Sequence, residues 1–275
     1  MAKSNLIQRV LAAAVFGPVL VVLFWLGDYW LFVMWCGVVS IGTWEFYRML
    51  SQKGLQPWTG FGIIISLSWC AVAFVIGPNA FVFFFLVLLL LMFSIALFRD
   101  TTGYRMLNAG GTLLGVLYVG FLGSFVLIVR NTLSVGAPEL AVLILLGIWA
   151  NDTMAYFFGR WFGRWHPFPT ISAAKTEAGF IGGLLSALLV TGLGGQVLGL
   201  FNIAQSLILG LLIGIGASLG DLVESMIKRD MDVKDTSELI PGHGGVLDRF
   251  DSTFFVFPLV YLYLQLIAST PPVLD

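Results

Sequence analysis

Charged residues are scarce in this chain. Only 11% of its 275 residues are charged and 59% are hydrophobic, whereas a soluble globular domain has about 25% charged residues. This composition excludes an ordinary soluble domain and is typical of a protein that crosses a membrane several times. The formal net charge is −1 and there is no basic tail, so nothing in the sequence indicates nucleic acid as a partner.

Cysteine is almost absent. Cys36 and Cys70 are the two cysteines, and each is isolated in an apolar run. This setting predicts buried, inert thiols and argues against a disulfide or a metal pair. The first apolar run, residues 10–27, is followed by the bulky sequence "DYW" and has no small-residue cleavage site. We therefore predict that it is a retained span and not a signal peptide.

Long apolar runs are abundant, and a membrane span needs ~20 mostly apolar residues. Nine spans are predicted, at residues 10–27, 29–47, 60–77, 79–98, 111–130, 138–158, 179–200, 203–227 and 252–269. Glycine is frequent in the sixth to eighth of these spans. Glycine there predicts close packing of helices through small residues.

The basic residues test the orientation of these spans, because Lys and Arg gather on the cytoplasmic side. With the N-terminus in the cytoplasm, thirteen of the fourteen basic residues fall on that side, and only Arg130 falls outside. The predicted fold is an all-α, polytopic integral membrane protein with about nine transmembrane helices, a cytoplasmic N-terminus and an external C-terminus. We expect residues 1–135 to form five scaffold spans that also contact lipid. Residues 136–275 would form four catalytic spans with a site on the cytoplasmic side.

Charge is concentrated near the C-terminal end, where twelve of the 29 charged residues lie between Asp221 and Asp251. On a helix, one face spanning about 140° carries most of the polar side chains of 221–229: Asp221, Glu224, Ser225, Lys228 and Arg229. Lys228 and Arg229 can reach water from a helix end. Asp221 and Glu224 lie further inward, and ionisable groups at such depth favour a functional polar cavity.

The loop "ELIPGHGGVLDRFD" follows this helix. Gly244 and Gly245 allow backbone conformations that can direct successive N–H groups at an anion. Asp248 and Asp251 stand at the start of the ninth span, where Asp251 is as well suited to capping the helix as to catalysis. His243 can act as a general base, contact phosphate or support the loop.

Asp221 on one helix and Asp248 at the start of the next, with cations between them, predict a magnesium–phosphate site. Mg²⁺ takes few protein carboxylates and completes its shell with water and phosphate oxygens. Cationic side chains neutralise the remaining phosphate charge, and four are available here: Lys228, Arg229, Lys234 and Arg249.

A second group of polar residues lies at the end of the sixth span. Asn151 and Asp152 stand roughly two turns inside it, either as a structural hydrogen-bonded pair or as a functional carboxylate site. In the loop that follows, Thr176 can cap the next helix, and Lys175 can bind a phosphate or a lipid headgroup.

The sequence "SMIKRDMDVKDTSELIPGHGGVLDRFD", residues 225–251, resembles the signature of the phosphatidate cytidylyltransferases, also called CDP-diacylglycerol synthases. "DTMAYFFGRWFG" is similar to a second helix of that family. The resemblance is strong over the C-terminal half and general over the N-terminal half. One departure is "SAAKTEAG", residues 172–179, where Ala173 replaces a proline and Glu177–Ala178 replace Trp-Glu. Either Glu177 substitutes for the family's glutamate, or this corner has a different function.

The resemblance implies transfer of CMP from CTP to phosphatidic acid, giving CDP-diacylglycerol and pyrophosphate. It also implies a bacterial inner-membrane location, with Mg²⁺ and a second metal ion, divalent or K⁺, as cofactors. Asp221 and Asp248 would bind metal, with Glu224 and Asp251 as further candidates, and the catalytic set is Asp221, Asp248, Lys228 and Arg229. Candidate substrate contacts are Asp152, Lys175, Thr176, Ser225, Lys234, Asp235, His243, Gly244, Gly245 and Arg249.

Two other functions remain open at this point, as does a homodimer. A CTP-dependent lipid kinase of the polyprenol or phytol type would use a similar site. An ion or metabolite transporter would use the intramembrane carboxylates, although the polar residues cluster on one side and no charged path crosses the membrane.

Overall fold

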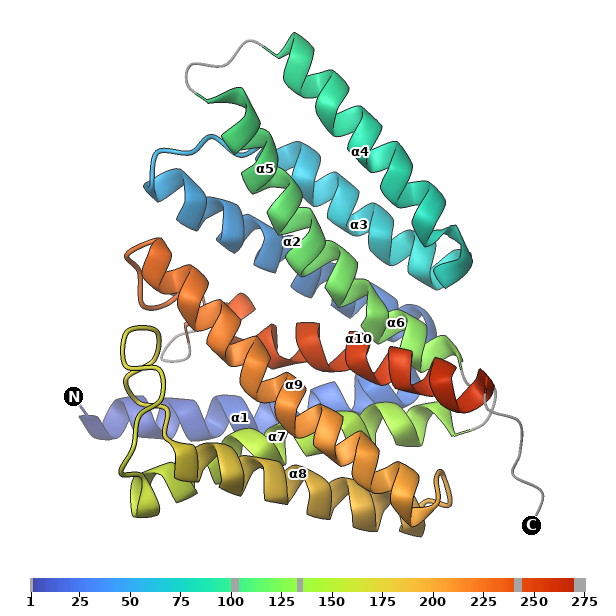
Figure 1. The fold of residues 1–275 in the computed structure, drawn as a ribbon, viewed down its shortest axis with the longest axis vertical. Coiled ribbons are helices and arrows are strands. Elements are labelled where there is room, and N and C mark those ends of the chain that lie inside the picture. The colour runs from blue at the N-terminus through green and yellow to red at the C-terminus, as the bar shows by residue number, and fades with distance from the viewer. Residues whose placement is uncertain (1, 100–103, 133–135, 240–243, 270–275) are drawn as a thin grey trace. The chain divides into compact units, whose positions relative to one another are not determined.

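A computed structural model describes residues 2–99, 104–132, 136–239 and 244–269, with side chains from Ala14 onward except those of Thr132 and Ser269 (Figure 1). Its regular elements are helices: α1 (Ala2–Leu26), α2 (Asp28–Gln52), α3 (Thr59–Val75), η1 (Pro78–Ala80), α4 (Phe81–Phe98), α5 (Arg105–Gly115), η2 (Val116–Phe121), α6 (Leu122–Thr132), α7 (Ala137–Phe162), α8 (Glu177–Val197), α9 (Ile203–Asp230) and α10 (Leu247–Ser269). Because η1 leads into α4, and α5, η2 and α6 are continuous, the described residues form nine helical segments. Each segment corresponds to one predicted apolar run.

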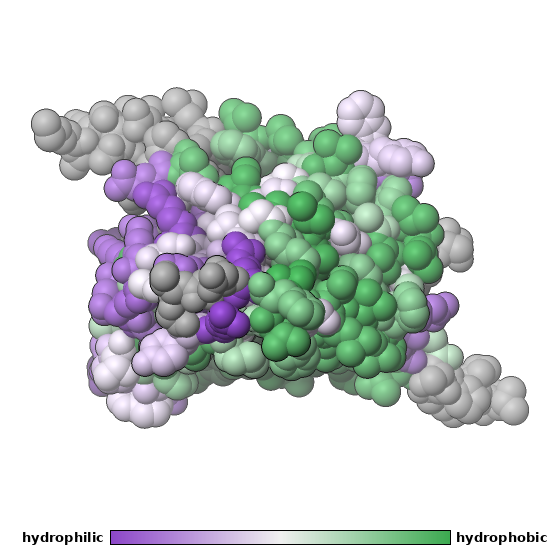
Figure 2. Space-filling model, turned by 90° about the horizontal axis from the view of Figure 1, so that it is seen from above, coloured by the Kyte–Doolittle hydropathy of each residue, from purple (hydrophilic) through white to green (hydrophobic). Residues whose placement is uncertain are grey.

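Six of these segments are long and apolar enough to cross a membrane. They are 78–98, 105–131, 137–162, 177–197, 203–230 and 247–268, and two further apolar stretches, 14–26 and 59–75, are shorter. Large hydrophobic side chains are exposed on them, including Phe83, Leu90 and Leu189. Figure 2 shows hydrophobic residues over a broad area of the face in view. Lipid is the surrounding that such a surface fits, so the protein is an all-helical integral membrane protein.

The described chain divides into two compact units. The first combines Met1–Asn131 with Ile227–Phe250, and the second combines Thr132–Met226 with Asp251–Asp275. The end of α9 and the first turn of α10 therefore belong to the first unit, together with the loop that joins them. The assignment of residues 1–135 as scaffold spans and of residues 136–275 as catalytic spans stays a prediction.

Helix α2 is buried along one face in the first unit. The indole N–H of Trp35 donates a 2.7 Å hydrogen bond to the Gly123 carbonyl, and the Tyr47 hydroxyl donates one of 2.7 Å to the Thr112 carbonyl. Buried Trp and Tyr side chains need such partners for their polar atoms. These contacts hold α2 against the segment formed by α5, η2 and α6, and α2 also carries the buried Glu45.

Glycines bring the helices of the second unit close together. A Cβ on Gly179 of α8 would lie 2.7 Å from the Ala155 carbonyl of α7. A Cβ on Gly214 of α9 would lie 2.6 Å from a methyl of Leu184 on α8. Since real Cβ atoms do not approach other atoms this closely, the predicted packing of these spans through small residues is confirmed. Both cysteines are free; Cys70 is buried, as predicted, whereas Cys36 is only half-buried.

Candidate active site

Helix α10 begins at Leu247, five residues before the predicted span at 252. Asp248 therefore stands in its first turn, where a carboxylate interacts favourably with the helix dipole. Asp251 lies in the second turn, and its Oδ1 accepts a 2.6 Å hydrogen bond from the N–H of Ser252. The suggestion that Asp251 caps the start of this helix was therefore wrong, because the helix starts one turn earlier.

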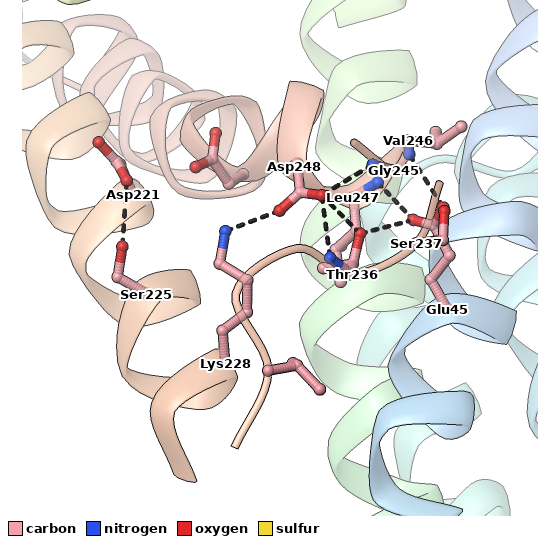
Figure 3. Close-up of polar contacts among 12 residues, drawn as sticks. Glu45, Asp221, Ser225, Lys228, Thr236, Ser237, Gly245, Val246, Leu247 and Asp248 are labelled. Atoms are coloured by element: carbon pink, nitrogen blue, oxygen red, sulfur yellow. Dashed lines mark hydrogen bonds and ion pairs between the residues drawn. The ribbon is translucent and has the colours of Figure 1, made fainter. Parts of the chain in front are cut away.

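Asp248 is the centre of a polar cluster in the first unit, which we call the Asp248 cluster: Glu45, Lys228, Thr236, Ser237, Gly245 and Asp248 (Figure 3). Its Oδ1 accepts a 2.7 Å hydrogen bond from Lys228 Nζ. Its Oδ2 accepts from the N–H of Gly245 at 2.8 Å, the N–H of Thr236 at 3.0 Å and the hydroxyl of Thr236 at 2.9 Å. Both oxygens are engaged, so the orientation of the carboxylate is fixed by the loop itself.

The Lys228–Asp248 ion pair is largely withdrawn from solvent. The side chains of Lys228 and Asp248 are 12% and 6% exposed. Charges buried to this extent depend on each other, and removing one partner of such a pair costs about 3–5 kcal/mol. The pair therefore ties the last turn of α9 to the first turn of α10 within the first unit.

The two glycines before α10 are needed for this geometry. Gly244 has φ +78°, a conformation that side chains disfavour, and a Cβ there would lie 2.7 Å from Asp248 Oδ2. A Cβ on Gly245 would lie 2.5 Å from Glu45 Oε1 and would overlap the Thr236 hydroxyl. The glycine pair thus lets the loop backbone approach two carboxylates.

Glu45 was missed by the sequence reasoning. Its side chain is fully buried on α2, and its oxygens accept hydrogen bonds from the Val246 N–H at 3.0 Å and the Leu247 N–H at 2.7 Å. They also accept from the hydroxyls of Thr236, at 3.2 Å, and Ser237. A signal was present, because Glu45 lies inside the predicted span 29–47, and ionisable groups inside spans are seldom without a role.

A second cluster lies in the second unit around Asp221, which we call the Asp221 cluster: Lys175, Asp221 and Ser225, with the Ser218 carbonyl. Lys175 Nζ lies 2.9 Å from Asp221 Oδ2 and 3.4 Å from the Ser218 carbonyl. The Ser225 hydroxyl donates a 3.4 Å hydrogen bond to Asp221 Oδ1. Lys175 belongs to the unusual "SAAKTEAG" corner, so this corner supplies the cation that faces Asp221.

The other residues predicted around α7 and α8 have mainly local contacts. Thr176 caps α8, as predicted, by accepting a 3.1 Å hydrogen bond from the Gly179 N–H. Asn151 Nδ2 donates a 3.2 Å hydrogen bond to Asp152 Oδ1. Glu177 is the exposed first residue of α8, where its charge favours the helix dipole.

The remaining predicted residues differ in burial. Glu224 is buried on α9. Four others are exposed at the end of α9, in the following loop or at the start of α10: Arg229, Lys234, Asp235 and Arg249. His243 lies outside the described residues.

The oxygen donors of the two clusters suit a hard divalent cation, which prefers carboxylates together with water and phosphate oxygens. Among the described residues, no three His, Cys, Asp or Glu side chains gather to form a complete metal cage. That is compatible with Mg²⁺, which usually binds through one or two carboxylates plus substrate phosphates. Asp248 and Asp221 each form an ion pair with a lysine, and a carboxylate that binds an ammonium group can also bind a metal cation.

Comparison with known proteins identifies the family. The sequence pattern of the cytidylyltransferase family matches residues 7–267 of the chain. The chain belongs to this family. Phosphatidate cytidylyltransferase of Synechocystis sp. is 35% identical over 94% of this chain and 97% of its own length. Phosphatidate cytidylyltransferase of Bacillus subtilis is 32% identical over 83% of this chain and 87% of its own length.

A third similar chain comes from Escherichia coli. The uncharacterized protein YnbB of Escherichia coli is 32% identical over 87% of this chain and 80% of its own length. The family resemblance inferred from residues 225–251 is thus confirmed over most of the chain.

Proposed function

We propose that this protein transfers CMP from CTP to phosphatidic acid, giving CDP-diacylglycerol and pyrophosphate. The observation that carries the proposal is the Asp248 cluster. The signature residues Lys228, Gly245 and Asp248 lie together there in one hydrogen-bonded group, within a chain similar to named phosphatidate cytidylyltransferases.

The rate of this reaction depends on positioning and charge neutralisation more than on proton transfer. An oxygen of the phosphatidate phosphate forms a bond to the α-phosphorus of CTP. The bond from that phosphorus to the bridging oxygen breaks, and pyrophosphate leaves with the electron pair. The attacking oxygen is already anionic, so no strong general base is needed. Holding the two phosphates together and offsetting their charge supplies the catalysis.

The lysines of the two clusters are suited to this work. Lys228 and Lys175 lie 2.7 and 2.9 Å from carboxylate oxygens of Asp248 and Asp221, and the largely buried pair gives the Lys228 ammonium a fixed position. We assign both lysines to phosphate contacts, since an ammonium donates to phosphate oxygens as a compact charge. Further contacts are assigned to Asp152, Thr176, Ser225, Arg229, Lys234, Asp235, Gly244 and Arg249, of which Thr176 and Ser225 are buried.

The sequence predicts Mg²⁺ as the cofactor, with Asp221 and Asp248 as its protein ligands and Glu224 and Asp251 as further candidates. When bound, it would offset phosphate charge and help pyrophosphate to leave. A second metal ion, a homodimer and the role of His243 stay predictions from the sequence.

The proposed orientation has nine spans, a cytoplasmic N-terminus and the site on the cytoplasmic side. Contacts within the first unit support it, because they join segments assigned to one side. Lys53 and Asp232, both assigned to the cytoplasm, form an ion pair. Arg130, assigned to the outside, donates hydrogen bonds to the Phe24 and Trp25 carbonyls at the outer end of α1. Arg130, the exception among the basic residues, thus has a structural task there.

A CTP-dependent lipid kinase is the rival reaction, and the position of a label separates the two. With CTP labelled at the α-phosphorus, the proposed reaction places the label in the lipid product, whereas a kinase leaves it in soluble CDP. With label at the γ-phosphorus, the expected products reverse: label in soluble pyrophosphate for the transferase, or in the lipid for the kinase. Lipid labelled only from the γ-phosphorus would refute the proposed function.

A further inference from the structure

Glu45 is a carboxylate whose burial must be explained. It is 0% exposed, and an ionised carboxylate away from water is costly unless hydrogen-bond donors surround it. Three donors do so: the N–H groups of Val246 and Leu247 and the hydroxyl of Ser237. The Thr236 hydroxyl also lies 3.2 Å from Glu45, and it shares its one proton with Asp248. All of these groups stand about 190–200 residues later in the chain, after α9 and at the start of α10.

These donors come from both ends of the loop. Thr236 and Ser237 follow the end of α9, whereas Val246 and Leu247 lead into α10. The first N–H groups of a helix have no partner within it, and a negative charge there is favourable. Glu45 thus acts as a helix cap supplied from α2, and it brings the two ends of the loop to one point.

Thr236 connects Glu45 to Asp248. Its hydroxyl lies 3.2 Å from Glu45 Oε2 and 2.9 Å from Asp248 Oδ2, and a hydroxyl has one proton to donate. Its N–H donates to Asp248 as well. The two carboxylates therefore share that one proton, and Thr236 supplies two of the four hydrogen bonds that orient Asp248 from a position next to Glu45 (Figure 3).

We propose that Glu45 is a positioning residue for catalysis: it holds residues 236–237 and 246–247 together and thereby sets the orientation of Asp248. This inference rests on the proposed function for its catalytic consequence, but the clamp itself does not. Glu45 is assigned no contact with phosphate and acts only through residues 236–237 and 246–247.

The test uses the full-length purified protein and the variant Glu45→Gln. Glutamine keeps the size but turns one oxygen into an NH₂ group that faces hydrogen-bond donors. We expect amide exchange at Val246 and Leu247 to rise about tenfold or more, as loss of one charge-assisted hydrogen bond implies. We also expect kcat to fall at least about tenfold and the Mg²⁺ concentration for half-maximal rate to rise, with little change in KM for phosphatidic acid.

Two controls separate positioning from general damage. Ser40→Ala removes a hydroxyl on the same helix that donates a 2.7 Å hydrogen bond to the Cys36 carbonyl one turn away, so exchange and kcat should match the wild type. Thr236→Val removes the hydroxyl that Glu45 and Asp248 share and should lower kcat as Glu45→Gln does, whereas Thr236→Ser keeps that hydroxyl and should lose less activity. If Glu45→Gln does not fold, an unchanged kcat in Thr236→Val would overturn the link between Glu45 and Asp248.

The outcomes are distinct. Unchanged exchange at Val246 and Leu247 in Glu45→Gln would overturn the clamp. Raised exchange with kcat and Mg²⁺ dependence unchanged would overturn the positioning role. A wild-type protein that makes no CDP-diacylglycerol would refute the proposed function, and the exchange measurement would still decide whether Glu45 holds the loop.

Discussion

Replacing Asp248 by asparagine should damage both the fold and the reaction, for two separable reasons. The side chains of Asp248 and Lys228 are 6% and 12% exposed, so solvent screens their attraction little. Asparagine can keep an oxygen toward Gly245 and Thr236, but its NH₂ group would then face the Lys228 ammonium. The uncompensated buried charge should lower the free energy of unfolding by about 3–5 kcal/mol.

A double-mutant cycle separates stability from catalysis. Lys228→Met alone leaves the Asp248 carboxylate without its cation and should destabilise by a similar amount. Asp248→Asn combined with Lys228→Met removes both charges, and replacing a whole buried pair is often neutral or stabilising. The double variant should therefore regain most of the lost stability and remain inactive, because both residues are assigned to the reaction.

The assay has two parts on purified protein in detergent. Thermal unfolding of the wild type, the two single variants and the double variant gives the coupling free energy, and CDP-diacylglycerol formation gives the activity. Additive destabilisation in the double variant would refute the interpretation of a coupled buried pair. Full activity in Asp248→Asn would refute its assignment to the site.

Three further predictions concern other contacts. Gly245→Ala forces a methyl against Glu45 and should cost about 1–3 kcal/mol and most activity; wild-type unfolding and kcat would contradict the close approach. Lys175→Met should change the free energy of unfolding by less than about 1 kcal/mol, because the side chains of Lys175 and Asp221 are 24% and 45% exposed. The same variant should raise KM for CTP, and an unchanged KM and kcat would show that Lys175 is not part of the site. Arg130→Met should lower stability by about 1–3 kcal/mol through loss of hydrogen bonds to α1 while kcat stays normal, which unfolding and turnover measurements on one sample check.

The helices could be predicted from hydropathy because each apolar run carries its own signal. Every predicted run became a helical segment among the described residues. Helix ends were less certain, since turns obey local hydrogen bonding that hydropathy does not report. The start of α10 moved from 252 to Leu247, because Asp248 and Glu45 satisfy N–H groups at or just before its first turn. That shift changed the interpretation of Asp251.

The candidate site was predictable only where its residues lie close in the sequence. Lys228, Gly245 and Asp248 fall within one short charged segment, and the structure brings them together. Glu45 accepts hydrogen bonds from the same segment, although it lies on a helix near the other end of the chain. No local sequence pattern predicts a contact between residues so far apart. Lys175 was expected to meet phosphate, but its present partner, Asp221, depends on how α9 packs in the second unit.

The central claim is tested most directly by giving purified protein CTP, phosphatidic acid and Mg²⁺ and measuring CDP-diacylglycerol. We predict stoichiometric formation of CDP-diacylglycerol and pyrophosphate by the wild type, dependent on Mg²⁺, and none by Asp248→Asn. A folded wild-type protein that forms no CDP-diacylglycerol under these conditions would contradict the account.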